Sequence, residues 1–304
     1  MTGTVADGEI GDLTPGLRAA HDPLAGREAH GRLCVVLATQ GVPVVHVTDR
    51  GGHFSSRSVW DRCARARPLR PRATESSGCG GTTNRGARSD GMIAKALHYK
   101  QKGYKAIKMQ MAHTTNLRGD VDNVKRMREA LGPDTAIMID INQGWTADVA
   151  INQGRKIADY DVYWLEEPVP ADDFKGYKRV AEALPIRIVG GETHFTRYDL
   201  RPFFENPCCP ILQPDPMRGG YTDLRKISVL ADTWGLQMAP HLFPELNVQL
   251  LASIPNGAWI EDMGLSEDLW VEPVKVINGT ITAPERPGHG LAFRPEILKD
   301  CRVA

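Results

Sequence analysis

Three acidic residues stand at positions where buried β-strands are expected to end. Asp140, Glu166 and Glu192 each follow a short apolar run, and the intervals between them are equal. Apolar runs of this length, separated by helix-length segments, are typical of buried parallel strands. Carboxylates that converge from neighbouring strand ends suit a divalent cation such as Mg²⁺, which prefers oxygen ligands. Single acids often follow strands by chance, but three at equal spacing favour a metal site.

A histidine and two further acids follow later apolar runs. His241 is a candidate general base, because imidazole changes its charge near neutral pH. A lone histidine is more often structural, but Asp215 ends the preceding run and can hold one ring nitrogen, which raises the basicity of the other. Glu261 could donate to an oxyanion only if burial raised its pKa. An ordinary acid at a strand end is nearly as good an interpretation of Glu261.

Strand-like and helix-like segments alternate from residue 89 onward. Residues 104–111 alternate as a strand, and runs ending at the acids and His241 follow it. This alternation predicts an α/β protein with a TIM-type (β/α)7β barrel of parallel strands, whose functional groups lie at the carboxyl ends of the strands. The strand expected before Met92 is missing or degraded, and residues 73–80 are its expected place.

The chain is expected to divide into three parts. Residues 1–88 hold neither the helix nor the strand period and become rich in Arg, Pro, Gly and Ser. We expect this part to be poorly ordered or a remnant of a cap. The barrel domain is expected at 89–268. The tail, 269–304, contains a hairpin turn at Asn278-Gly279 and should pack on the cap or the barrel.

Composition excludes several classes of function. The 304 residues hold 37 basic and 37 acidic side chains, so nothing indicates binding to nucleic acid or to an anionic membrane. The arginine-rich stretch lacks the interleaved aromatic residues of a nucleic-acid module. Six cysteines without metal-ligand spacing suit a reducing compartment, and no apolar run reaches the length of a membrane span. We therefore expect a soluble, cytoplasmic protein. A homo-oligomer is also expected, although composition does not bear on it.

An ordered set of motifs connects these positions: Lys108 in KAIKMQ, Asp140 and Asn142 in IDIN, Glu166 in WLEEP, Glu192 in GGE, Asp215 in QPD, His241 in PHLFPE and Glu261 in WIED. With this set, the chain from Met92 to the C-terminus resembles the enolase superfamily, specifically its mandelate racemase-like subgroup, which includes many acid-sugar dehydratases. The resemblance implies one Mg²⁺ ion bound by the first three acids, and a base formed by His241 with Asp215. It further implies that Lys108 pairs with the substrate carboxylate, that Glu261 serves a carboxylate oxygen, and that Asn142 lies near metal or substrate.

One position departs from the subgroup and limits the reaction. Members commonly carry Lys-x-Lys on the second strand, but Gln110 replaces the second lysine here and cannot take a proton. A racemase that uses two bases is therefore disfavoured, and a cycloisomerase is disfavoured because a lysine beside Asp215 is missing. A sugar-acid dehydratase that forms a 2-keto-3-deoxy acid is favoured. Gln110, His113 and His194 are candidate substrate contacts.

A second departure concerns the cap. Members have an N-terminal cap whose loops close over the barrel mouth, and residues 1–88 show no such pattern. Without a lid, water stays in the site and electrostatic stabilisation weakens. A catalytically impaired barrel that only binds metal or associates with other subunits is therefore the alternative to an active dehydratase.

Overall fold

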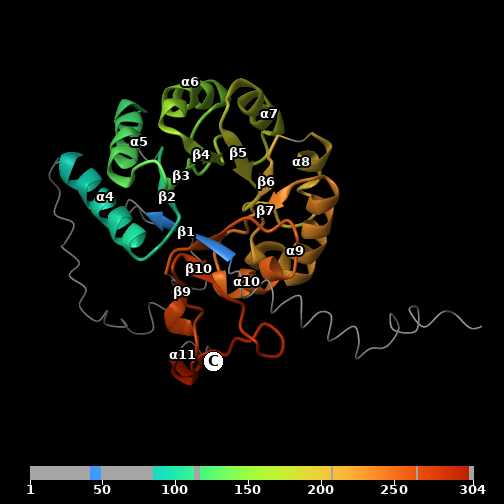
Figure 1. The fold of residues 1–304 in the computed structure, drawn as a ribbon. Helices are drawn as coiled ribbons and strands as arrows, with labels where there is room; N and C mark the ends of the chain where they lie inside the picture. The colour runs from blue at the N-terminus through green and yellow to red at the C-terminus, as the bar shows by residue number, and fades with distance from the viewer. Residues whose placement is uncertain (1–41, 49–84, 113–116, 207, 265, 301–304) are drawn as a thin grey trace, which may run out of the picture.

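The computed structural model describes residues 42–48, 85–112, 117–206, 208–264 and 266–300. Strands and helices alternate along them (Figure 1). In chain order the elements are β1 (Val42–Thr48), α4 (Arg85–Gln101), β2 (Ala106–Gln110), α5 (Leu117–Leu131), β3 (Ala136–Asp140), α6 (Ala147–Ile157), β4 (Val162–Glu166), α7 (Phe174–Ala183), β5 (Arg187–Gly190), α8 (Arg201–Glu205), β6 (Ile211–Leu212), α9 (Pro216–Thr233), β7 (Gln237–Met238), α10 (Pro244–Ala252), β8 (Ile260–Asp262), β9 (Val276–Ile277), β10 (Thr280–Ile281) and α11 (Pro295–Asp300).

The strands from β1 to β8 form a closed parallel barrel. Each strand from β1 to β6 pairs in parallel with the next, and β8 pairs in parallel with β1. A parallel bridge between Met238 and Gly257 brings the end of β7 beside the segment that leads into β8. The helices α5 to α9 lie outside this ring of strands (Figure 1). The predicted (β/α)7β barrel is confirmed.

The first barrel strand lies earlier in the chain than expected. Residues 73–80 are outside the described part of the chain, and the strand that the structure shows is β1. Val45 in β1 is paired with Ala106 of β2 on one side and with Glu261 of β8 on the other. β1 thus precedes the boundary predicted at residue 88 and nevertheless belongs to the barrel. Its pairing depends on partners far away in the sequence, which a short apolar run does not reveal.

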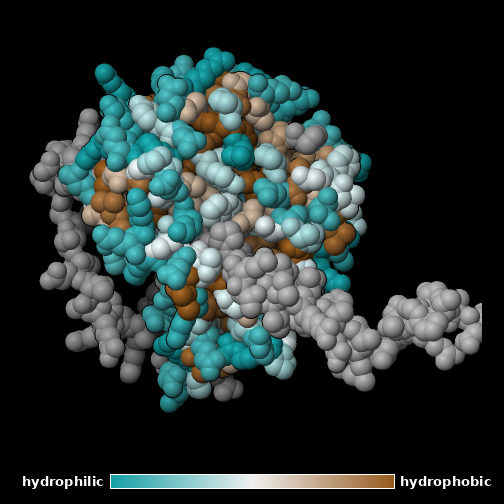
Figure 2. All heavy atoms as spheres, in the orientation of Figure 1, coloured by the Kyte–Doolittle hydropathy of each residue, from teal (hydrophilic) through white to brown (hydrophobic). Residues whose placement is uncertain are grey.

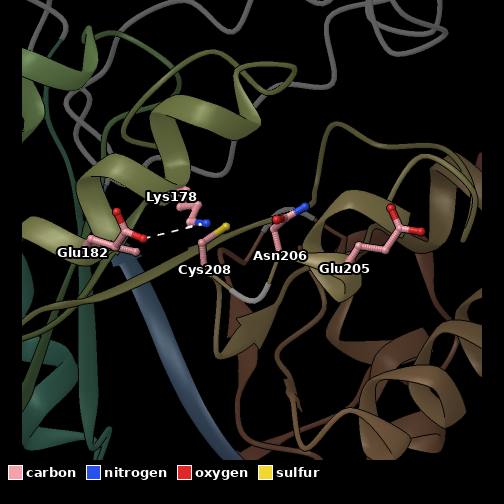
Figure 3. Close-up of a pocket in the computed structure, with 6 residues that line it drawn as sticks. Lys178, Glu182, Glu205, Asn206 and Cys208 are labelled. Carbon is pink, nitrogen blue, oxygen red and sulfur yellow. Dashed lines mark ion pairs between the residues drawn. The ribbon is translucent and has the colours of Figure 1, made fainter.

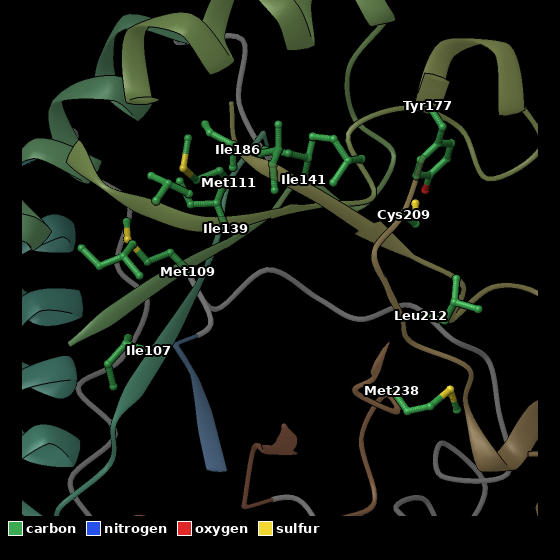
Figure 4. Close-up of a cluster of buried hydrophobic side chains, with 14 of the residues drawn as sticks. Ile107, Met109, Met111, Ile139, Ile141, Tyr177, Ile186, Cys209, Leu212 and Met238 are labelled. Carbon is green, nitrogen blue, oxygen red and sulfur yellow. The ribbon is translucent and has the colours of Figure 1, made fainter. Parts of the chain in front are cut away.

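Side chains alternate between the inside of the barrel and the layer under the helices. One buried cluster lies inside the ring: Ala106, Met138, Trp164, Val189, Ile211 and Ala239. Their neighbours Ile107, Ile139 and Leu165 belong to the larger core, part of which Figure 4 shows. Because the period along a strand is two, Lys108, Asp140 and Glu166 lie on the inner side, one step nearer the carboxyl ends. The polar residues at the strand ends therefore lie directly above a layer of apolar side chains that fills the barrel.

The helices present their polar sides outward. In α6, Thr146 caps the N-terminus by accepting a hydrogen bond from the Val149 N–H, and Ala150 and Ile157 face the core. Hydrophilic residues cover much of the face seen in Figure 2, with smaller apolar areas between them. Among the described residues, every helix is too short or too polar to cross a membrane.

The tail forms the predicted hairpin and contacts the barrel. Asn278 and Gly279 connect β9 to β10 with φ angles of 51° and 74°, as a tight two-residue turn requires. A Cβ on Gly279 would lie 2.1 Å from the Gly103 carbonyl oxygen, so only glycine allows this close approach. β10 in turn pairs antiparallel with β1. The hairpin therefore covers the side of the barrel next to its first strand.

Candidate active site

The acids predicted from the sequence gather at the carboxyl ends of the strands. Asp140 ends β3, opposite Gln110 of β2 and Glu166 of β4 in the sheet register. Glu192 follows β5 after Gly191, whose φ of 123° is a conformation that a side chain disfavours. Asp140, Glu166 and Glu192 are all buried. The barrel thus places three carboxylates at one end, as expected.

A lysine ammonium lies among these acids. Lys108 is 1% exposed, and its Nζ is 2.6 Å from Glu166 Oε1, 2.6 Å from Glu261 Oε1 and 3.8 Å from Asp140 Oδ2. Burial lowers the pKa of Lys108, but the surrounding carboxylates outweigh it and hold the pKa well above its ordinary value. A buried charge requires such partners, because leaving it unpaired is very costly.

The predicted contact between His241 and Asp215 is present. His241 Nδ1 is 2.7 Å from Asp215 Oδ2, while the other Asp215 oxygen accepts a hydrogen bond of 2.6 Å from the Met217 N–H at the start of α9. Both oxygens of Asp215 are therefore engaged, and its carboxylate is fixed. The contact to Nδ1 leaves Nε2 of His241 facing the site.

The protonation of His241 depends on the acids around Nε2. This atom is 3.4 Å from Glu192 Oε2 and 3.8 Å from Glu261 Oε2. Burial lowers the pKa of His241, but Glu192, Glu261 and the bond to Asp215 raise it to about 10. In this arrangement the imidazole is protonated at neutral pH. Any change that neutralises the two glutamates would lower its pKa.

Glu261 does not behave as an acid that retains its proton. Burial raises its pKa, but Lys108 and His241 overcome this effect and leave the pKa of Glu261 below its ordinary value. It also accepts a hydrogen bond of 2.8 Å from the Leu242 N–H. The condition under which Glu261 could donate to an oxyanion, a net rise of its pKa, is therefore not met in this arrangement. Glu261 is a carboxylate because it faces two cations.

The three predicted metal ligands have properties that fit a divalent cation. Glu166 Oε2 and Glu192 Oε2 are buried without a hydrogen-bond partner in the described part of the chain. Burial raises the pKa of Glu166 to about 7 and that of Glu192 well above its usual range, as expected for acids that lack sufficient positive charge. Within the described ranges, no three such side chains are already arranged as a ligand set, and Lys108 lies beside two of them. The metal assignment stays a prediction, consistent with the oxygen donors.

Of the remaining predicted substrate contacts, two lie beside Asp140 and one is outside the described residues. Gln110 is buried on β2 opposite Asp140, and Asn142 donates hydrogen bonds of 2.9 and 3.0 Å to Asp140 from its main-chain N–H and its side-chain amide. His113 lies outside the described residues.

His194 does not have the surroundings expected of a substrate contact. Its ring centroid is 5.7 Å from that of Phe174 and 5.3 Å from that of Phe203, two residues of the outer helices α7 and α8. Burial lowers its pKa. Its contacts are those of a packing residue, and the predicted substrate contact is not supported by them. Proximity to a strand end does not fix which way a side chain turns.

Three polar residues next to the acids form a network that the sequence did not indicate. Gln143, Glu167 and Thr193 hydrogen-bond to one another from the loops after β3, β4 and β5. Each comes one to three residues after a predicted metal ligand, which was a usable signal. Polar residues are common in such loops, so their position alone did not distinguish them.

A shallow pocket lies elsewhere, on the outside of the barrel. It has a volume of about 400 Å³ and is lined by residues of α7 and by the end of α8 with the segment after it (Figure 3). It contains the exposed ion pair between Lys178 and Glu182, which are 3.9 Å apart. The predicted site residues do not line it, and its exposed ion pair offers little chemistry.

Comparison with known proteins agrees with the fold. Residues 91–297 match the family model described as enolase C-terminal domain-like, and the chain belongs to this family. A 3,6-anhydro-alpha-L-galactonate cycloisomerase of Streptomyces coelicolor is 37% identical over 198 residues, covering 64% of this chain and 55% of the relative. An arabinonate dehydratase of Saccharolobus solfataricus is 29% identical, covering 67% of this chain and 57% of the relative. The chain thus spans little more than half the length of these curated relatives.

Solved structures show the same fold. A racemase from Streptomyces coelicolor with bound magnesium has a TM-score of 0.69 and 28% identity, covering 90% of this chain and 69% of that one. A 3,6-anhydro-D-galactonate cycloisomerase from Zobellia galactanivorans has a TM-score of 0.65 and 30% identity, covering 69% and 62%. The predicted resemblance to the enolase superfamily is confirmed.

Proposed function

We propose that this protein dehydrates a sugar acid, an aldonate or aldarate, to a 2-keto-3-deoxy acid in a Mg²⁺-dependent reaction. The observation that carries the proposal is the partly buried His241–Asp215 pair, whose second ring nitrogen lies near Glu192 and Glu261 at the carboxyl end of a barrel. Such a pair suits removal of the weakly acidic proton next to a carboxylate. The dehydratases among the relatives, at about 30% identity, support the same class of reaction.

His241 would act as the only base. Its Nε2 takes the proton from the carbon next to the substrate carboxylate, and the bond to Asp215 stabilises the imidazolium that forms. The electron pair of the broken C–H bond forms the enediolate. Collapse of the enediolate forms the C=C bond and expels the β-hydroxyl, which takes the proton from His241 and leaves as water. The enol tautomerises to the 2-keto acid. Gln110 cannot take a proton, so removal from the opposite face is not expected.

Lys108 would bind the negative end of the substrate. Its ammonium is buried and already lies between Glu166 and Glu261, so a substrate carboxylate that approaches it meets a fixed positive charge. Charge that develops in a buried site is stabilised best by such preplaced groups. Glu261 contacts Lys108 and accepts a hydrogen bond from the Leu242 N–H, so it would keep the Lys108 ammonium in position. It would act on a carboxylate oxygen of the substrate indirectly, by way of Lys108.

Asp140, Glu166 and Glu192 would hold one Mg²⁺ ion. Glu166 Oε2 and Glu192 Oε2 are buried and accept no hydrogen bond in the described part of the chain, and this supports the assignment, as does the bound magnesium of the Streptomyces coelicolor racemase structure. When bound, the ion would supply Lewis-acid stabilisation of the enediolate and would offset the glutamate charges that hold His241 protonated. Asn142 would orient Asp140 through its two hydrogen bonds.

A cycloisomerase is the second candidate. Two relatives, the anhydrogalactonate enzyme at 37% identity and a D-galactarolactone cycloisomerase of Agrobacterium fabrum at 29%, carry that activity in their names. A cycloisomerase could use the same removal of the α-proton by His241 as a dehydratase. If the oxygen expelled from the β-carbon belongs to a ring, the ring opens and no water is lost. This route does not need a lysine beside Asp215.

The test is a substrate screen. The purified chain with Mg²⁺ is assayed against aldonates, aldarates and anhydro sugar acids, and 2-keto products are measured together with the mass of each product. Loss of 18 Da, the mass of water, indicates dehydration, and unchanged mass indicates isomerisation. His241→Asn should abolish the activity, while His98→Asn on the exposed surface of α4 should retain it.

Two results would contradict the proposal. An active His241→Asn variant would refute the assignment of the base. Failure of the parent protein on the whole panel would favour the catalytically impaired barrel. The cytoplasmic location and the homo-oligomer remain predictions.

A further inference from the structure

The loops that follow strands β3, β4 and β5 are joined to one another next to the predicted metal ligands. Glu167 Oε2 accepts a hydrogen bond of 3.1 Å from Gln143 Nε2, and Glu167 Oε1 accepts one of 3.0 Å from Thr193 Oγ1. Gln143 Nε2 also donates to Thr193 Oγ1 at 3.0 Å, which closes a three-membered ring of side chains. The loops after β3, β4 and β5 are thereby connected; Asp140 and Glu166 directly precede the first two loops, and Glu192 lies in the third.

Glu167 is the buried centre of this network. It is 1% exposed and follows Glu166 directly, yet its bonds are to Gln143 and Thr193, whereas Glu166 faces Lys108 inside the barrel. Adjacent residues of a strand end point to opposite sides, so one glutamate faces the site and the next faces the loops. Gln143 Oε1 further accepts a hydrogen bond of 3.0 Å from the Ala171 N–H, which anchors the ring to the segment before α7.

The main chain at these positions adopts conformations that need support. Asn142, Gln143 and Glu167 have positive φ angles of 47°, 63° and 38°, which non-glycine residues rarely adopt. Two main-chain hydrogen bonds also connect these strand ends. The Gln143 N–H donates to the Glu167 carbonyl at 2.8 Å, and the Glu167 N–H donates to the Val189 carbonyl at 3.0 Å. The side-chain and main-chain bonds together fix the loops at the strand ends.

We propose that Glu167 is a positioning residue for the metal site: by bridging Gln143 and Thr193 it holds the strand ends at the spacing that lets Asp140, Glu166 and Glu192 share one cation. This inference rests on the proposed function, because it assumes that these acids bind Mg²⁺. Glu167 itself accepts hydrogen bonds from Gln143 and Thr193 and is not one of the three acids that would hold the ion. Groups that hold metal ligands in place typically change metal affinity by about 10- to 100-fold when they are lost.

The experiment measures Mg²⁺ affinity and stability separately in the full chain. Mg²⁺ binding is titrated by calorimetry, and unfolding is measured in EDTA, for the parent, Glu167→Leu, Glu167→Gln, Gln143→Glu and the double variant Gln143→Glu/Glu167→Gln. The leucine variant removes both acceptors and should bind Mg²⁺ about 10- to 100-fold more weakly. Glu182→Gln, which removes an equal charge from an exposed helix position, is the control and should bind like the parent.

The double variant tests the geometry of the network. It reverses the amide and the carboxylate, so a donor still faces an acceptor between positions 143 and 167, and position 143 can still accept from the Ala171 N–H. It should therefore bind Mg²⁺ more tightly than Glu167→Gln alone, whereas Gln143→Glu alone, which sets two carboxylates against each other, should bind less tightly than the parent; two independent sites would not show this coupling. If the leucine variant fails to fold, the comparison of Mg²⁺ affinity between Glu167→Gln and the double variant still tests the positioning role.

The outcomes separate the two proposals. If the parent protein does not bind Mg²⁺, the proposed function fails. If the parent binds and the Glu167 variants lose stability in EDTA but keep the parent's Mg²⁺ affinity, the network only supports the fold, and the positioning role is refuted. A weaker affinity that the double variant partly restores supports the positioning role.

Discussion

Replacing Lys108 by methionine removes the positive charge at the centre of the acidic cluster while keeping the side chain long and apolar. Lys108 Nζ is 2.6 Å from both Glu166 and Glu261, and all three side chains are buried. Removing one partner of a buried ion pair costs about 3–5 kcal/mol, because the remaining charge is uncompensated. A domain of this size loses about 2–4 °C in Tm per kcal/mol, so the Tm in EDTA should fall by about 6–20 °C.

The assay is thermal unfolding in EDTA and in excess Mg²⁺. Lys178→Met is the control, because Lys178 and Glu182 form an exposed pair, 54% and 66% accessible, whose loss should cost less than about 1 kcal/mol. Excess Mg²⁺ should stabilise Lys108→Met more than the parent, because the ion replaces the missing charge. Equal Tm values for parent and Lys108→Met in EDTA would refute the view that Lys108 holds the acids together.

Three further predictions concern neighbouring positions. The pKa of His241 is raised to about 10, so its ion pairs stabilise the fold fully below its ordinary value of 6.5, and this contribution disappears as the pH rises to 10. Urea unfolding in EDTA should show the stability difference between parent and His241→Asn shrinking over that range, and a constant difference would contradict the assigned contacts. Gly191→Ala should cost about 1–3 kcal/mol in the same assay, because its φ of 123° strains any side chain, and an unchanged stability would be inconsistent with that conformation. Gln110→Lys should introduce a second base, so that NMR detects exchange of the α-proton of a substrate with solvent deuterium from the opposite face; absence of that exchange would show that position 110 does not reach the α-carbon.

The barrel could be predicted because its signals are local. Each strand is a short apolar run, each run ends in a polar residue, and helices separate the runs, so the order of elements from β2 to β8 follows from periodicity. β1 could not be placed in this way. It is held by pairing to β2, β8 and β10, and these partners are distant in the sequence.

The site was predictable in its membership but not in its electrostatics. The contact between His241 and Asp215 follows from two adjacent strands that end at the same level. The low pKa of Glu261 depends on its 2.6 Å distance to Lys108, which no sequence pattern reveals. His194 and Glu167 depend on which way a residue turns after a strand. Glu167 turns toward Gln143 and Thr193 with a positive φ, and this was found only in the structure.

The central claim is that Asp140, Glu166 and Glu192 share one divalent ion in front of His241. Anomalous diffraction from crystals grown with Mn²⁺, which prefers similar oxygen ligands, tests it most directly. We predict a single strong anomalous peak within bonding distance of all three carboxylates, with Lys108 Nζ no longer in contact with Glu166 but still beside Glu261. A peak bound elsewhere, or a crystal grown in millimolar Mn²⁺ with no peak at these acids, would contradict the account.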